Sequence, residues 1–170
     1  RALGIDPARP LLVAGSTAPE EHALLLEALP PDVQILCAPR RPEWFDDAAR
    51  VLQGCARRSL GIPGSERGRF LLDTIGELSA AYALADVVVI GRSFGELHGS
   101  DMMEPCSLGK PVVVGPATDD FSDTVEKLLE GDGLVVTDSG NLSVVLAELF
   151  ASTEKRERLS ANARAVVRAQ

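Results

Sequence analysis

The chain between residues 95 and 116 reads GELHGSDMMEPCSLGKPVVVGP. The glycines in its first part predict a loop, Pro105 predicts the first turn of a short helix, and Val112–Val114 predicts a buried strand. Such a loop–helix–strand passage is typical of open α/β sheets, in which ligands bind beyond the carboxyl ends of the strands. The stretch therefore predicts an α/β domain with a ligand site at this edge of its sheet.

The rest of the chain alternates in the same way between apolar runs and helical patterns. Most runs are short, β-branched and apolar on both faces, as expected of strands covered by helices on each side. The expected strands are 11–14, 33–38, 57–60, 70–72, 87–90, 112–114 and 134–136. The expected helices are 20–29, 42–53, 75–85, 105–108, 122–130, 142–150 and 154–167, with an exposed loop over 60–69. The alternation predicts a Rossmann-like fold, a mostly parallel sheet with helices on both faces.

Length and composition narrow the class of protein further. The 170 residues suffice for one good-sized domain, 1–170. A net charge of -8 argues against a general nucleic-acid binder, which needs a basic surface. No apolar run approaches the about 18–20 residues that span a bilayer, and three cysteines without metal-ligand spacing predict reduced thiols. Because the chain begins at Arg1, we expect it to be a fragment of a longer protein.

Polar residues follow the first two expected strands. Ser16 and Thr17 come directly after the first, and Thr17 has capping-box spacing to Glu20. A helix cap accounts for this pair, and an anion bound at the same helix start is the alternative. After the second strand, Arg40 is either an ordinary surface charge or a planar fork that meets a phosphate or carboxylate.

The fourth and fifth strands are followed by further candidates. Thr74 and Glu77 again have capping-box spacing, and Gly76 in the first helical turn would let a nucleotide base approach the backbone. Pro105 predicts that Glu104 occupies the cap position of the short helix, where glutamate is not a favoured residue. A ligand role for Glu104 is therefore favoured over a purely structural one. No Ser-His-Asp set, metal signature or Walker-type loop is present, so the chemistry indicated is binding.

These motifs together resemble the C-terminal half of the 3-deoxy-D-manno-octulosonic acid (Kdo) transferases, which load Kdo onto lipid A precursors. The resemblance runs in order from about Pro10 to Val136. It rests on residues 14–17, 38–43, 72–78, 82–86 and 104–116. No single segment is specific for the family, whereas the ordered series is.

The resemblance implies a GT-B glycosyltransferase, built from two facing Rossmann-like domains. This chain would be the donor-binding half, which takes CMP-Kdo, and would carry no catalytic residue itself. The missing N-terminal domain would bind the lipid A precursor and supply the catalytic acid. The reaction implied needs no metal and no cofactor. It would take place in the cytoplasm, on the inner face of the cytoplasmic membrane.

The family's donor-binding positions correspond to eight residues of this chain. The resemblance implies that amides at the start of the short helix face a phosphate and that Glu104 closes this motif. Arg40 would lie near the CMP, and residues 75–77 would touch the nucleotide. The implied donor-binding residues are Ser16, Arg40, Ile75, Gly76, Glu77, Ser100, Asp101 and Glu104.

The chain departs from the family pattern in the phosphate-binding loop. The family has GGHNPLE where residues 98–104 read HGSDMME. Asp101 replaces an amide donor by a carboxyl group, whose negative charge is unfavourable beside a phosphate unless it is protonated, paired or turned away. Arg92 stands where the family tends to have glycine and offers a compensating charge. The alternatives are therefore a GT-B domain for a UDP- or GDP-sugar and a nucleotide-binding module without transferase activity.

Overall fold

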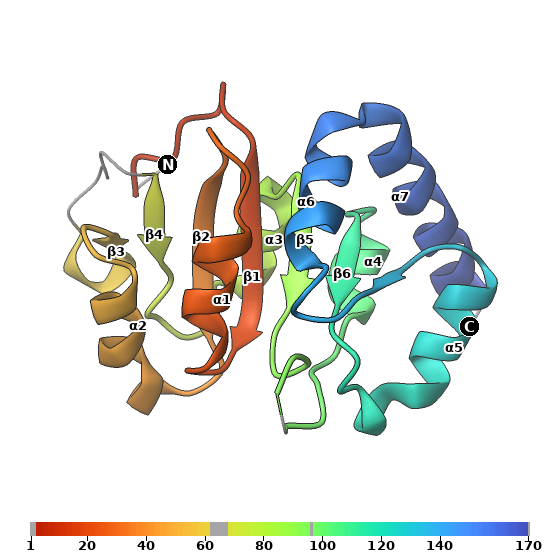
Figure 1. Ribbon diagram of the computed structural model, residues 1–170, viewed down its shortest axis with the longest axis horizontal. Helices are drawn as coiled ribbons and strands as arrows, with labels where there is room; N and C mark the ends of the chain where they lie inside the picture. Colours follow the sequence, from red (N-terminus) through yellow and green to blue (C-terminus); the bar gives the residue numbers. More distant parts are fainter. Residues whose placement is uncertain (1–2, 62–67, 96, 170) are drawn as a thin grey trace.

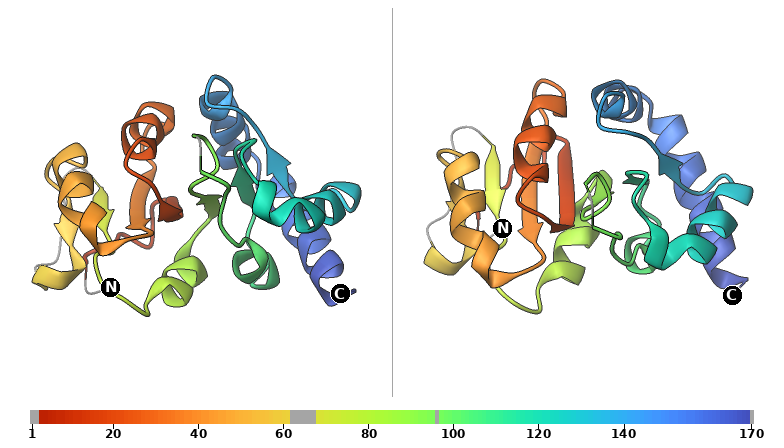
Figure 2. Two further views of the ribbon diagram at one scale, coloured as in Figure 1. Left: turned by 90° about the horizontal axis from the view of Figure 1, so that it is seen from below. Right: turned by 60° about the horizontal axis from the view of Figure 1, so that its bottom comes forward.

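The computed structural model describes residues 3–61, 68–95 and 97–169 and consists of one sheet between two layers of helices (Figures 1 and 2). Seven strands pair in the order β3-β4-β2-β1-β5-β6-β7, and every pairing is parallel. The strands are β1 (Leu11–Thr17), β2 (Gln34–Pro39), β3 (Ala56–Arg57), β4 (Arg69–Leu71), β5 (Val87–Ile90), β6 (Val112–Val114) and β7 (Val135–Val136). The expected Rossmann-like class is confirmed.

Seven α-helices cover the two faces of the sheet. They are α1 (Glu21–Ala28), α2 (Phe45–Val51), α3 (Leu78–Leu84), α4 (Met103–Ser107), α5 (Ser122–Glu130), α6 (Leu142–Ala151) and α7 (Thr153–Arg168). Short 3-10 helices occupy Pro42–Trp44 (η1), Arg58–Leu60 (η2) and Asp119–Phe121 (η3). Helices α1, α2 and α6 pack on one face, and α3, α4 and α5 pack on the other.

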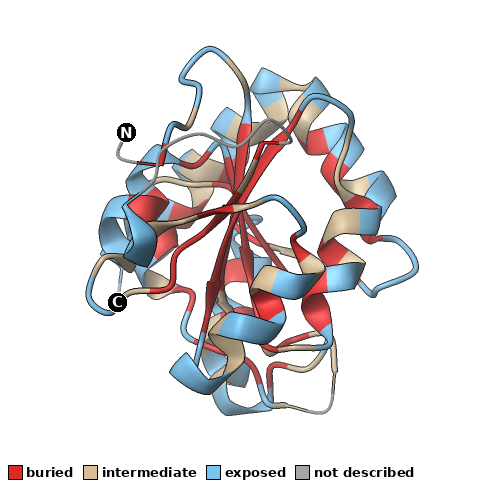
Figure 3. Ribbon diagram, turned by 90° about the vertical axis from the view of Figure 1, so that its left-hand side faces the viewer, coloured by how far each residue is buried: buried red, intermediate tan, exposed pale blue. Residues whose placement is uncertain are grey.

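Alternate residues of each strand feed two separate cores. Leu11 and Val13 of β1 belong to the core beneath α3, whereas Leu12 and Ala14 belong to the core beneath α1. All four side chains are at most 2% exposed. Figure 3 shows the buried strands between helices whose outer sides are exposed. Burial on both faces explains why the strand sequences are continuously apolar.

Several element boundaries differ from those expected from the sequence. The weak strand expected at 57–60 is the two-residue β3 followed by η2. The helix expected from Ile75 begins at Leu78 because Gly76 has a φ of +88°, which a right-handed helix does not accommodate. The loop expected over 60–69 lies largely at 62–67, outside the described residues.

Neither expected capping box forms. The Thr17 hydroxyl bonds to Nε2 of His22 instead of a helix amide, because β1 continues through Thr17 and buries it. The Thr74 hydroxyl donates to the carboxylate of Glu77, so these two side chains satisfy each other.

The buried carboxylate of Glu21 replaces the first expected cap and joins two distant segments. Its oxygens accept hydrogen bonds from the backbone amides of Ala18 (2.9 Å), Arg92 (2.8 Å), Ser93 (3.1 Å) and Phe94 (3.2 Å). Burial raises the pKa of Glu21 above its ordinary value, and these amides oppose the shift. Glu21 thereby holds the loop after β5 against the start of α1.

We expect Glu21→Gln to lower the free energy of unfolding by about 2–4 kcal/mol, because the glutamine NH₂ group adds donors where the backbone amides need acceptors. Urea denaturation at neutral pH measures the change. Glu20→Gln is the matched control, since Glu20 is an exposed neighbour, and its effect should stay within about 0.5 kcal/mol. A loss in Glu21→Gln no larger than in the control would contradict this role.

Candidate functional site

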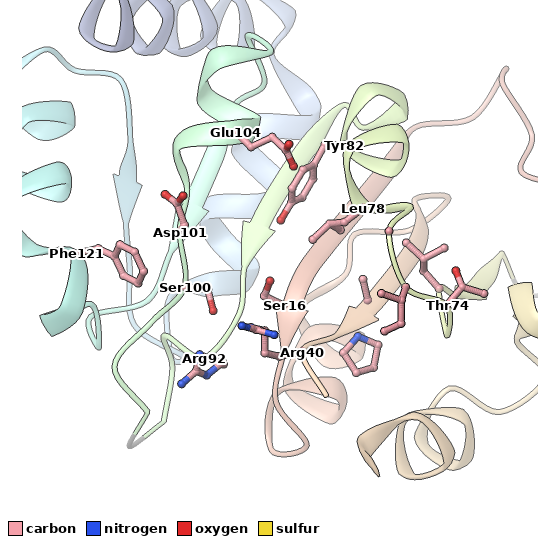
Figure 4. Close-up of a pocket in the computed structure, with 15 residues that line it drawn as sticks. Ser16, Arg40, Thr74, Leu78, Tyr82, Arg92, Ser100, Asp101, Glu104 and Phe121 are labelled. Atoms are coloured by element: carbon pink, nitrogen blue, oxygen red, sulfur yellow. The ribbon is translucent and has the colours of Figure 1, made fainter. Parts of the chain in front are cut away.

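A cleft of about 520 Å³ opens at the carboxyl ends of the strands. The chain builds the sheet outward from β1 in one direction and from β5 in the other, so the strand order reverses between these two neighbours. Ligands of open α/β sheets bind at such a switch point. Figure 4 shows the cleft. It is lined by Ser16, Ala38, Pro39, Arg40, Leu72, Thr74, Ile75, Gly76, Leu78, Tyr82, Arg92, Ser100, Asp101, Glu104 and Phe121.

Seven of the eight residues expected to bind the donor line this cleft. They come from four separate segments of the chain and are Ser16, Arg40, Ile75, Gly76, Ser100, Asp101 and Glu104. Ile75 is 79% exposed at the rim, and Gly76 adds no side chain beside it. This part of the rim offers an exposed apolar side chain beside open space.

Glu77 does not line the cleft. Its carboxylate accepts hydrogen bonds from Thr74 (2.6 Å) and from the guanidinium of Arg58 (3.2 Å). These bonds hold the pKa of Glu77 below its ordinary value. In this arrangement Glu77 holds the segment that carries Ile75 and Gly76 in place. It supports the rim of the cleft without lining it.

Cationic and hydroxyl groups gather at one end of the cleft. Figure 4 shows Arg40 and Arg92 near Ser16 and Ser100, whereas Tyr82 and Glu104 lie toward the other end. The Ser16 position is set by a bulge between Gly15 and Thr17, where Ser16 has a φ of +56°. Two guanidinium groups beside two hydroxyls make this end suited to an anion.

The two carboxylates of the cleft each have a partner within the chain. Oδ1 of Asp101 accepts from the amide of Met103 (3.0 Å), and Oε2 of Glu104 accepts from the hydroxyl of Ser79 (2.6 Å). Helix α4 begins at Met103, so Glu104 lies inside its first turn and does not occupy the cap position that was expected. Pro105 is tolerated there because an amide in the first turn has no partner within the helix. The Asp101 carboxylate therefore accepts a hydrogen bond from the Met103 amide, one of the helix-start amides that the family resemblance implied would face a phosphate.

Tyr82 is a wall of the cleft that the sequence did not single out as a site residue. Its ring lies over β1 at Gly15, where a Cβ would meet the Tyr82 hydroxyl at 2.0 Å. Burial raises the pKa of Tyr82 above its ordinary value. Phe121, from η3, closes the opposite side. Tyr82 begins the segment 82–86 that contributes to the family resemblance, but only the fold shows that Tyr82 and Phe121 line the site.

The buried carboxylate of Asp73 holds the chain next to the rim residues Thr74 and Ile75 in place. Asp73 accepts hydrogen bonds from the Ser59 amide (2.7 Å) and hydroxyl (2.5 Å) and from Nε of Arg57 (2.8 Å). Burial opposes ionisation of Asp73, yet the bonds from Ser59 and Arg57 hold its pKa below the ordinary value. The network ties η2 to the segment that follows β4.

Neither a membrane span nor a metal cluster occurs in the ranges that the structure describes. No helix there is both long and apolar enough to cross a bilayer. No three His, Cys, Asp or Glu side chains there are grouped so that they could hold a metal ion.

Comparison with known proteins identifies relatives of the whole domain. No protein-family model matches the chain. The 3-deoxy-D-manno-octulosonic acid transferase of Bordetella pertussis is 36% identical over 92% of the chain, and that of Haemophilus influenzae is 30% identical over 89%. The chain spans 40% and 38% of the length of these two relatives.

A solved structure of a single domain matches the chain over nearly the full length of both. The C-terminal CMP-Kdo binding domain of WaaA from Acinetobacter baumannii is 30% identical, with a TM-score of 0.86, and the match covers 94% of this chain and 89% of that domain. The chain belongs to the Kdo transferase family. WaaG, a glycosyltransferase of lipopolysaccharide biosynthesis, has a TM-score of 0.65 at 16% identity, which shows a shared fold alone.

Within this Kdo transferase domain, Arg40 is a cleft residue whose removal should affect the fold little. It is exposed, and its side chain has no hydrogen bond or ion pair with another described residue. Arg40→Ala should weaken binding of an anion at the cationic end of the cleft, tested with CMP because the similar WaaA domain binds CMP-Kdo, by about tenfold through loss of a charge-assisted contact. The melting temperature should change by less than about 2 °C. Calorimetric titration and thermal melts measure the two effects.

The exposed Arg41 provides the control for Arg40. Its guanidinium stacks over Trp44 and pairs with Glu43, away from the cleft. Arg41→Ala should leave CMP affinity within about twofold of the unsubstituted chain. Equal affinity losses in the two variants, or a large loss of stability in Arg40→Ala, would exclude a specific contact by Arg40.

Proposed function

We propose that this chain is the donor-binding domain of a glycosyltransferase that transfers Kdo from CMP-Kdo to a lipid A precursor in lipopolysaccharide biosynthesis. The observation that carries the proposal is the match to the CMP-Kdo binding domain of WaaA over nearly the full length of both. The cleft adds independent support, because it lies at the switch point and has a cationic end.

The donor would lie along the cleft with its phosphate at the cationic end. The base would rest on the rim at Ile75 and Gly76, where a flat ring meets an exposed apolar side chain and open space. The carboxylate of Glu104 would accept hydrogen bonds from the ribose hydroxyls. In this orientation the cationic end meets the phosphate, the apolar rim meets the base, and the carboxylate meets the ribose hydroxyls.

Catalysis would require a second domain, N-terminal to this one. A nucleotide phosphate leaves readily only when its growing negative charge is stabilised, and Arg40 with the Ser16 and Ser100 hydroxyls would do so in this half. The acceptor lipid and the catalytic acid would belong to the other half. The full-length protein would then work in the cytoplasm, on the inner face of the cytoplasmic membrane. One chain of 170 residues on its own would bind the donor without transferring it.

The experiment that tests the proposal is a calorimetric titration of the chain with CMP, UMP and GMP. The proposal predicts preferential binding of CMP. Preferential binding of UMP or GMP would keep the fold and replace the donor by a UDP- or GDP-sugar. The carboxylate of Asp101 within the cleft is the departure from the family pattern that bears on the identity of the donor. Absence of binding by all three would contradict nucleotide binding by this half alone.

The proposed ribose contact gives a second test. Glu104→Gln should lower affinity for CMP about three- to tenfold and affinity for 2′-deoxy-CMP by much less, because only the ribonucleotide offers the 2′-hydroxyl to the carboxylate. Ser79→Ala is the control, since it removes the hydroxyl that bonds to Glu104 and leaves the carboxylate in place. Equal losses of affinity for the two nucleotides in Glu104→Gln would remove Glu104 from the ribose.

A further inference from the structure

Arg92 occupies a backbone conformation that arginine rarely adopts. Its φ is +58°, in the left-handed region, where a side chain with a Cβ costs roughly 1 kcal/mol relative to glycine. The backbone is held there from both sides: the Arg92 amide donates to Glu21, and the Arg92 carbonyl accepts from the amide of Gly99 at 2.7 Å. Strained residues that the surrounding structure holds in place cluster at functional sites.

The residue held in this strained conformation lines the cleft and carries a buried donor without a partner. Arg92 lines the cleft, and its Nε atom is buried without a hydrogen-bond partner among the described residues. Ser100, only 6% exposed, lines the same cleft, and its hydroxyl likewise lacks a partner there. Figure 4 shows both side chains at the cationic end. A buried donor without an acceptor costs about 1–3 kcal/mol, so two of them at one end of a cleft indicate a missing acceptor.

The two described carboxylates that line the cleft do not fill that place. Asp101 bonds to the amide of Met103, and Glu104 bonds to Ser79 toward the other end of the cleft. The guanidinium of Arg92 has no ion pair with any carboxylate in the described part of the chain. No described carboxylate therefore supplies this acceptor, and a guanidinium beside a hydroxyl fits an anionic oxygen of a ligand best.

We infer that Arg92 and Ser100 together bind the phosphate of the nucleotide donor, with Arg92 as the residue that gives the cleft its affinity for the anion. The inference rests on the proposed function and deepens it. It also accounts for Asp101: a second cation, Arg92, offsets the carboxylate that lies in the same cleft, so a phosphate meets a positive end. Arg92 and not a helix amide is then the main phosphate contact from the loop after β5.

The test compares the unsubstituted chain with Arg92→Gly and Arg92→Lys by calorimetry, using CMP, cytidine and inorganic phosphate. Glycine suits a positive φ, so Arg92→Gly should fold with an unchanged or higher melting temperature. We expect it to bind CMP at least tenfold more weakly and cytidine within twofold of the unsubstituted chain. Arg92→Lys keeps the charge without the planar fork and should recover part of the CMP affinity.

Each outcome separates the inference from the proposed function. If Arg92→Gly retains the preference for CMP over cytidine, Arg92 does not bind the phosphate, while the proposed function stands. If the unsubstituted chain binds inorganic phosphate through Arg92 but binds neither CMP nor cytidine, Arg92 and Ser100 form an anion site and the CMP donor of the proposed function is wrong. A lower melting temperature in Arg92→Gly with equal losses for CMP and cytidine would make Arg92 structural. Binding of none of the three probes would overturn both.

Discussion

The hydrogen bonds to the buried Glu21 carboxylate are the constraint on which the cleft depends. One side chain in the first turn of α1 accepts from Ala18 and from three successive amides, residues 92–94, that lie more than 70 positions away in the sequence. These amides belong to a loop that would otherwise have to find acceptors in solvent. Because they are held, the loop after β5 leaves the sheet in one direction, and Arg92 is fixed at the switch point.

Close backbone approach completes this constraint. A Cβ on Gly91 would lie 2.5 Å from the carbonyl oxygen of Ser16, so glycine is required where the end of β5 meets the end of β1. The Ser93 hydroxyl then donates to the carbonyl of Ile90 and accepts from the amide of Gly115, which joins the ends of β5 and β6. The carboxyl edge of the sheet is thus a connected network of buried polar groups. Such a network specifies one geometry, because any rearrangement leaves a buried group unpaired.

Features that depend on neighbouring residues in the sequence were predictable. Features that depend on contacts between residues distant in the sequence were not. The strands were predictable because runs such as Val87–Ile90 are apolar on both faces, and burial between two helix layers requires that pattern. Helix starts were less predictable. The spacing of Thr74 and Glu77 is that of a capping box, but the positive φ of Gly76 moves the helix start to Leu78. Local spacing does not contain that information.

The site was predictable only where chemistry and topology coincide. Residues that follow strand ends, such as Ser16 and Arg40, were found because parallel strands bring their carboxyl ends to one edge, whereas Ser100 was expected only from the resemblance to the Kdo transferases. Tyr82 was missed because its place in the cleft depends on packing over Gly15, a contact between residues distant in the sequence. The role of Glu21 was missed for the same reason. In the sequence it is one acidic residue at a helix start, and its partners at 92–94 become visible only in the fold.

The most direct measurement is an NMR titration of the isotope-labelled chain with CMP, following the backbone amides. The largest shift changes should cluster at the carboxyl edge of the sheet, at Ser16, Arg40, 75–76, 92–94 and 100–104. Amides at the opposite edge, before β5 and β6, should remain unaffected. Shift changes centred at that opposite edge or on the outer faces of α6 and α7, with the carboxyl edge unperturbed, would contradict the assignment of this cleft as the donor site.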